Sequence, residues 1–84
     1  MAGHILDVRK VRESETEVEY EFNLRRKPER YEFTIDKKTG EVEYDLSLDV
    51  DIVQMAWAAV WRKAGRPKPP TPQTVWPDKA THIG

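Results

Sequence analysis

Apolar and polar residues alternate almost without error through the middle of this 84-residue chain. Three runs carry the pattern, 17–24, 31–36 and 42–48, and within each run the β-branched and aromatic side chains share one parity. A repeat of two is that of an antiparallel β-strand with one covered face. Pro28 and Gly40 stand in the two intervening segments, where a strand must stop and a hairpin must turn. The pattern therefore predicts an antiparallel meander.

The same alternation predicts which residues face each other across the two turns. If Asp36 faces Glu41, then Phe33 faces Tyr44, and across the other turn Phe22 is expected to face Phe33. Both hairpins then carry their large apolar side chains on one side, which a slip of one residue would destroy.

A further strand is expected at residues 4–12, ahead of the meander. The parity of its apolar residues is mixed, because Leu6 and Val8 share one parity whereas Ile5 and Val11 share the other. Either a bulge near residues 9–10 or an edge position in the sheet explains such a pattern.

The segment from Ile52 to Trp61 is apolar except for Gln54. Ser47 or Asp49 can cap its start and Gly65 is a suitable stop after it, so we expect a helix that begins near Asp49. A helix that covers one sheet needs only about half of its circumference to be apolar, which leaves this one with more apolar surface than a sheet can hide. The stripe expected against the sheet is Val53, Ala56, Trp57, Val60 and Ala64.

The expected fold class is α+β: a four-stranded antiparallel β-meander followed by one C-terminal α-helix packed on the sheet (ββββα), with an extended Pro-rich tail. Residues 1–65 form the single α+β domain and residues 66–84 the tail. The length of the chain allows no more than one domain.

The tail supports three interpretations. Arg66, Pro69 and Pro72 match the basic-x-x-Pro-x-x-Pro pattern that aromatic grooves of SH3-type domains recognise. The segment also suits a stiff linker that lets Val75 and Trp76 dock on the domain or on a neighbouring chain, or a disordered end.

The helix surface outside the sheet-facing stripe predicts a protein-binding module. Small side chains there allow a second helix to approach closely, so we expect a homodimer through the helix, or else docking of another protein. The alternative is that alanine is merely a good helix former and is often exposed. The predicted interface residues are Met55, Ala58, Ala59, Trp61 and Trp76.

Charge is segregated along the chain, and it suggests a second kind of partner. Residues 41–51 hold five acidic and no basic side chains, whereas residues 52–84 hold five basic and one acidic. Carboxylates between residues 17 and 45 are expected on the open face of the sheet, where they could dock a basic protein as small acidic immunity or inhibitor proteins do. The alternative is a charged face that keeps the sheet soluble.

Single-stranded nucleic acid is a further alternative. Four antiparallel strands followed by a C-terminal helix resemble, in element order only, the single-stranded-DNA-binding transcriptional coactivators, which dimerise through that helix. No motif residue carries the resemblance, and the aromatic residues that would stack bases share the parity of the core. The contact residues would be Arg25, Arg26, Lys27 and Arg30, together with basic residues after the helix.

The chemistry of the sequence predicts a protein that is not an enzyme and holds no cofactor or metal. There are no cysteines, and His4 and His82 stand near opposite ends without acidic or thiol partners at metal-ligand spacing. The apolar run at 52–61 is about half a membrane span, so no membrane association is expected. We expect the protein to be cytoplasmic.

Overall fold

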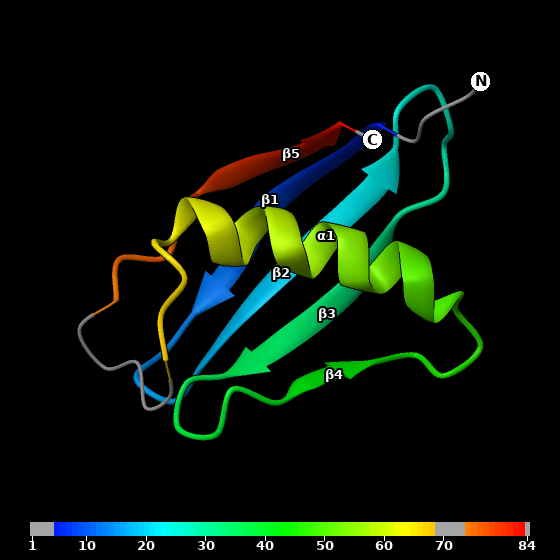
Figure 1. The fold of residues 1–84 in the computed structure, drawn as a ribbon. Helices are drawn as coiled ribbons and strands as arrows, with labels where there is room; N and C mark the ends of the chain where they lie inside the picture. The colour runs from blue at the N-terminus through cyan, green and yellow to red at the C-terminus, as the bar shows by residue number, and fades with distance from the viewer. Residues whose placement is uncertain (1–4, 69–73, 84) are drawn as a thin grey trace.

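A computed structural model describes residues 5–68 and 74–83 of the chain. These residues form a five-stranded antiparallel sheet in the order β4-β3-β2-β1-β5 and one helix (Figure 1). The elements are β1 (Ile5–Glu13), β2 (Glu17–Leu24), β3 (Tyr31–Asp36), β4 (Val42–Tyr44), α1 (Val50–Lys63) and β5 (Lys79–Ile83).

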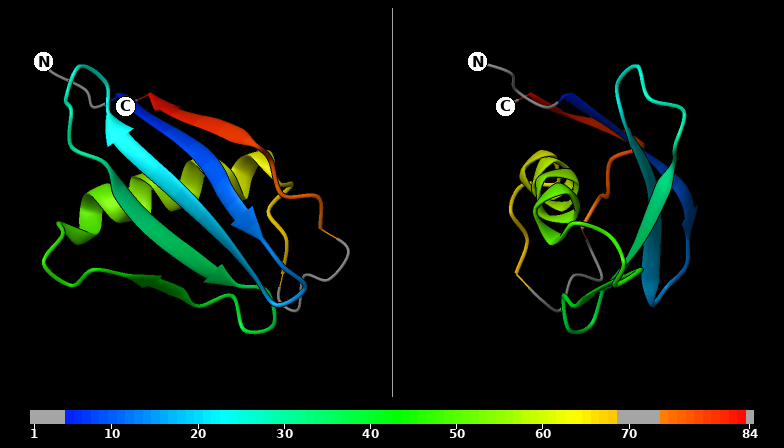
Figure 2. Two further views of the ribbon diagram at one scale, coloured as in Figure 1. Left: turned by 180° about the vertical axis from the view of Figure 1, so that it is seen from behind. Right: turned by 90° about the vertical axis from the view of Figure 1, so that its right-hand side faces the viewer.

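The helix lies across one face of the sheet, so the protein has two layers with its core between them (Figure 2). Contacts of α1 with the sheet are concentrated on β5 and β1. The opposite edge of the sheet, at β4, therefore lacks comparable cover. The largest fully buried side chains are Tyr20, Phe22, Phe33, Leu6, Ile35, Val18 and Val60.

The predicted α+β class with an antiparallel sheet and one helix is confirmed, but the strand number is wrong. A fifth strand, β5, follows the helix and pairs antiparallel with β1, with Ala80 opposite Val8 and Ile83 opposite Ile5. The sequence of residues 77–84 shows no strand pattern, because only Ala80 and His82 have the parity that faces the core. The extended Pro-rich segment falls largely on residues 69–73, which lie outside the described residues.

One predicted register is confirmed and the other is wrong by two residues. Phe33 lies opposite Tyr44, as expected. Between β2 and β3, however, Phe33 lies opposite Tyr20 and Phe22 lies opposite Tyr31. The shift widens the turn, in which Arg26 adopts a φ of 74°. A two-residue shift preserves parity, so the core face is unchanged and the alternation alone could not exclude it.

The mixed parity of the first strand comes from a bulge, not from an edge position. The register of β1 against β2 shifts between Lys10 and Arg12, which places one extra residue, Val11, in β1. The strand itself lies inside the sheet, between β2 and β5.

The fourth strand is shorter than the expected 42–48. It ends at Tyr44, because Asp45 begins a turn in which its carboxylate accepts the N–H of Ser47 and its carbonyl accepts the N–H of Leu48. Leu46, expected on the core side, is 87% exposed.

The helix begins where its predicted cap places it. The Asp49 carboxylate accepts the N–H of Asp51 at 2.9 Å, Asp51 lies in the first turn, and Arg62 and Lys63 lie in the last. Gly65 follows with a φ of 92°, the left-handed conformation that terminates helices. The side chains that α1 buries are Val53, Ala56, Ala59 and Val60.

Candidate protein-interaction surfaces

The five residues predicted to form a protein interface do not share one exposed surface in the structure. Ala59 and Trp76 are buried in the core of their own chain, so we leave them out of the interface. Met55 is partly buried against that core, and Ala58 and Trp61 are partly exposed on α1. The helix rotates slightly from its predicted orientation, so that Ala59 packs inward and Trp57 is only partly buried.

The solvent side of α1 carries a regular stripe, which we call the α1 ridge: Asp51, Met55, Ala58 and Arg62. These positions follow one another at intervals of four, three and four residues, which places them along one side of a helix. Asp51 and Arg62 are exposed, and Met55 and Ala58 are partly exposed between them. The ridge therefore has an acidic end, a small apolar middle and a basic end.

Two tryptophans line the side of α1 next to the ridge. The rings of Trp57 and Trp61 stack, with centroids 5.3 Å apart and an angle of 15° between their planes. The indole N–H of Trp61 donates to the Pro67 carbonyl at 3.1 Å, which fixes the chain after the helix. Both rings are partly exposed. Tryptophan has a large apolar surface that is usually buried, so two partly exposed tryptophans side by side are uncommon.

A groove of about 440 Å³ separates α1 from β4. It exists because the helix packs mainly over the β5 and β1 side of the sheet. Val50, at the start of the helix, is 44% exposed beside it. The lining is mostly apolar: Val42, Tyr44, Val50, Val53, Gln54, Trp57 and Ala58.

The outer face of the sheet is not uniformly acidic, because several of its carboxylates pair with arginines. Arg9 binds Glu21, and the Arg12 guanidinium lies 3.0 Å from both Glu17 and Glu19. The sequence analysis placed these carboxylates on the open face correctly, but it did not match them to basic partners on the adjacent strand. These ion pairs reduce the negative charge of the outer face, so the face attracts a basic protein less strongly than its carboxylates alone would.

Like charges meet on the same face between β2 and β3. A hydrogen bond with Glu19, together with the charge of that residue, raises the pKa of the Glu32 carboxyl above its ordinary value.

Five of the carboxylates that have no ion-pair partner among the described residues gather at β4 and the start of α1. All five of them are exposed. They are Glu41, Glu43, Asp45, Asp49 and Asp51. A hydrogen bond from the Ser47 backbone lowers the pKa of Asp45, so this carboxyl stays ionised. The largest group of unpaired carboxylates in the described residues therefore borders the β4 edge of the sheet and the start of α1.

The four residues predicted to contact nucleic acid lie together in the β2–β3 turn, but two of them are paired with carboxylates. Arg25 donates to Asp7 at 2.8 and 3.1 Å, and the Arg30 guanidinium lies 3.5 Å from Glu21. Within the described residues, Arg26 and Lys27 have no such pair. The surface available to phosphate is correspondingly small.

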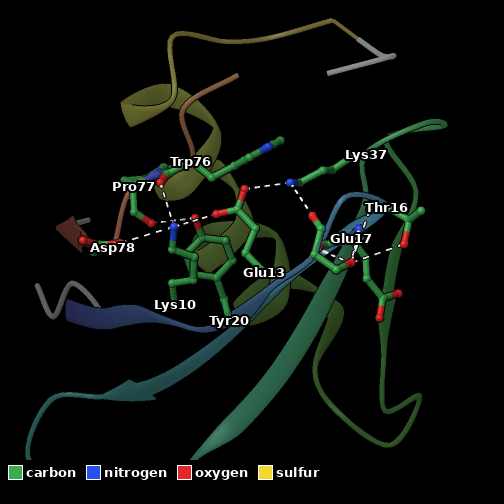
Figure 3. Close-up of polar contacts among 10 residues, drawn as sticks. Lys10, Glu13, Thr16, Glu17, Tyr20, Lys37, Trp76, Pro77 and Asp78 are labelled. Atoms are coloured by element: carbon green, nitrogen blue, oxygen red, sulfur yellow. Dashed lines mark hydrogen bonds and ion pairs between the residues drawn. The ribbon is translucent and has the colours of Figure 1, made fainter. Parts of the chain in front are cut away.

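A polar cluster that the sequence analysis missed joins the segment after the helix to the sheet (Figure 3). One Glu13 oxygen lies 2.7 Å from the Lys10 ammonium and the other lies 2.7 Å from the Lys37 ammonium. Lys10 also donates to the Trp76 carbonyl, and the Tyr20 hydroxyl donates to the Pro77 carbonyl at 2.7 Å. The partners are up to 66 residues apart in sequence, so no local pattern could have found them.

Among the described residues, no group of three or more His, Cys, Asp and Glu side chains is placed to hold a metal ion. In the same part of the chain, no helix has the length and apolarity needed to cross a membrane. Comparisons of the chain with protein-family models, with curated proteins and with solved structures gave no match.

Proposed function

We propose that the protein is a small non-enzymatic protein-binding module that forms a homodimer through the α1 ridge. The observation that carries the proposal is the order of side chains along the ridge, acidic at Asp51, small and apolar at Met55 and Ala58, and basic at Arg62. A surface of this kind is complementary to itself when the helices of two copies pack antiparallel about a two-fold axis.

An antiparallel pair of helices satisfies both ends of the ridge at once. A two-fold axis near the middle of α1 places Asp51 beside Arg62 of the second copy, and Met55 beside Ala58. The two-fold symmetry repeats each pair, so every dimer contains two acid-to-base contacts and two apolar contacts. A parallel arrangement would bring like charges together at each end.

The surroundings of the ridge support the same orientation. Five acidic residues lie at 41–51, next to the start of α1, and four basic residues lie at 62–68, at and beyond its end. Antiparallel pairing brings the acidic group of one copy near the basic group of the other copy. This arrangement favours association and fixes the register of the two helices.

Reversing one charge of the ridge should break the dimer, and reversing both should restore it. Asp51→Arg sets two arginines against each other at both ends of the dimer, and Arg62→Asp does the same with two carboxylates. We expect each single change to raise the dimer dissociation constant about tenfold or more, since each turns two attractions into repulsions. The double variant recovers complementarity. Sedimentation velocity over a range of concentrations measures the dimer dissociation constant of the wild type, the two single variants and the double variant.

A matched exchange of charges away from the ridge serves as the control. Glu15→Arg with Lys38→Asp alters two exposed turn residues and should leave the dissociation constant unchanged. A wild-type chain that stays monomeric at high concentration contradicts the homodimer. A dimer that the double variant fails to restore contradicts the antiparallel register. Titration with a single-stranded oligonucleotide at two salt concentrations tests the nucleic-acid alternative, because phosphate contacts weaken steeply as salt rises.

A further inference from the structure

The β4 edge of the sheet has an open hydrogen-bonding side. β4 ends the sheet, and no described strand pairs with its far side. The Asp36 N–H donates to the Glu41 carbonyl at 2.8 Å, so the backbone of Glu41 points toward β3. Bonding alternates along an antiparallel pair, which turns the N–H and C=O groups of Val42 and Tyr44 outward.

The same two residues supply the side chains of β4 that line the groove. Val42 and Tyr44 contribute to its lining with Trp57 and Ala58 of α1. A strand added beside β4 would place every second side chain at the mouth of this groove. Those side chains would have to be apolar to be compatible with its lining.

The remaining side chains of an added strand would meet carboxylates. Glu43 has the opposite parity to Val42 and Tyr44, so it lies on the outer face of the sheet, and Glu41 and Asp45 flank the strand on either side; all three are exposed. Residues directly opposite on neighbouring strands interact, and opposite charges there are favourable. The alternate positions of the added strand should therefore be Lys or Arg.

We infer that the β4 edge and the groove beside it bind an extended segment of a partner protein in which apolar residues alternate with Lys or Arg. The segment extends the sheet by one antiparallel strand, its apolar side chains cover the groove, and its basic side chains pair with the β4 carboxylates. The groove shares Ala58 with the α1 ridge, but the open backbone and the carboxylates of the β4 edge lie outside the ridge. A second copy of β4 is a poor occupant, because the Glu43 side chains of two copies would face each other across the new edge.

A designed peptide tests the inference directly. The probe is a capped seven-residue peptide that alternates Lys and Val, and binding is measured by the change in tryptophan fluorescence, to which Trp57 contributes, and by amide exchange in NMR spectra. We expect saturable binding that weakens as salt rises, with slower exchange of the Val42 and Tyr44 amides. A peptide with Glu in place of each Lys should bind at least about tenfold more weakly. A peptide of the same composition with its lysines and valines in separate blocks should also lose affinity.

Two protein variants separate this site from other surfaces. Glu43→Lys should weaken the alternating peptide several-fold, whereas Glu29→Lys, an equal charge change in the exposed β2–β3 turn, should not. Arg62→Asp, at the end of the α1 ridge away from the groove, should bind the peptide no more weakly than the wild type does. Equal binding of the Glu-containing peptide overturns the charge complementarity. Binding without protection of the Val42 and Tyr44 amides overturns strand addition, and no binding of any peptide overturns the site.

Discussion

Trp76→Ala is expected to destabilise the fold by about 3–5 kcal/mol, the usual cost of removing a buried aromatic ring. The Trp76 side chain belongs to the core and only 5% of its surface is exposed. It also precedes the strand that pairs with β1, so its loss frees β5 as well. In a domain with a total stability of about 5–15 kcal/mol, such a change removes a large fraction of the free energy of unfolding.

The neighbouring residue and a smaller aromatic provide the controls. Val75 is 85% exposed, so Val75→Ala should change the free energy of unfolding by less than about 0.5 kcal/mol. The indole nitrogen of Trp76 has no hydrogen-bond partner among the described residues, so Trp76→Phe breaks no bond and should cost clearly less than the alanine change. Urea unfolding measures the three variants. Equal stability of Trp76→Ala and the wild type would show that the segment after α1 does not contribute to the core.

The fold could be predicted as far as short-range patterns determine it. The shared parity of Val18, Tyr20 and Phe22 identified the core face of β2, because successive side chains of a strand point to opposite faces. The Asp49 cap and Gly65 bounded the helix, because both act within one turn of backbone. These features needed no knowledge of what packs against them.

Features that depend on distant partners could not be predicted in this way. β5 has weak alternation, with Ala80 as its only buried residue, and it is a strand because β1 offers an open edge. The pairing of Arg12 with Glu17 and Glu19 depends on a bulge whose register the sequence left open. The sequence shows the five acidic residues at 41–51, but it could not show that they stay unpaired, because that required knowing which carboxylates the arginines neutralise.

The largest polar effect on stability is expected at Glu13. Its side chain is 31% exposed and lies between the ammonium groups of Lys10 and Lys37, of which Lys37 is only 10% exposed. Lys37 also donates to the Ser14 carbonyl at 2.6 Å. Glu13→Ala leaves both ammonium groups without their shared carboxylate, and we expect a loss of roughly 2 kcal/mol, because hydrogen bonds to charged groups are the stronger kind. Glu15→Ala removes the same charge from an exposed turn and should cost almost nothing.

A double variant separates the loss of the attraction between Glu13 and Lys37 from the cost of burying the Lys37 charge without this carboxylate. Lys37→Met keeps the aliphatic length of the side chain and removes its charge. In the Glu13→Ala background it should recover part of the lost stability, since it removes the nearly buried charge that Glu13 neutralised. A Glu13→Ala protein as stable as the wild type would show that the cluster is only a surface ion pair.

The pH dependence of stability has a sign that follows from the pKa shifts in this cluster. Hydrogen bonds from Lys10 and then Lys37 lower the pKa of the Glu13 carboxyl below its ordinary value. The stabilisation by Glu13 is therefore complete above the pKa of the unfolded carboxyl, at about 4.3, and is lost as pH falls through the lower folded value. The hydrogen bond with Glu13 raises the pKa of Lys10. The contribution of the protonated Lys10 to folding stability is therefore complete below the unfolded lysine value of about 10.4 and is lost at higher pH.

The difference in unfolding free energy between the wild type and Glu13→Gln should be constant between about pH 5 and 10 and should shrink on both sides. Urea titrations at a series of pH values measure it, and a difference that grew below pH 4 would contradict the assigned direction.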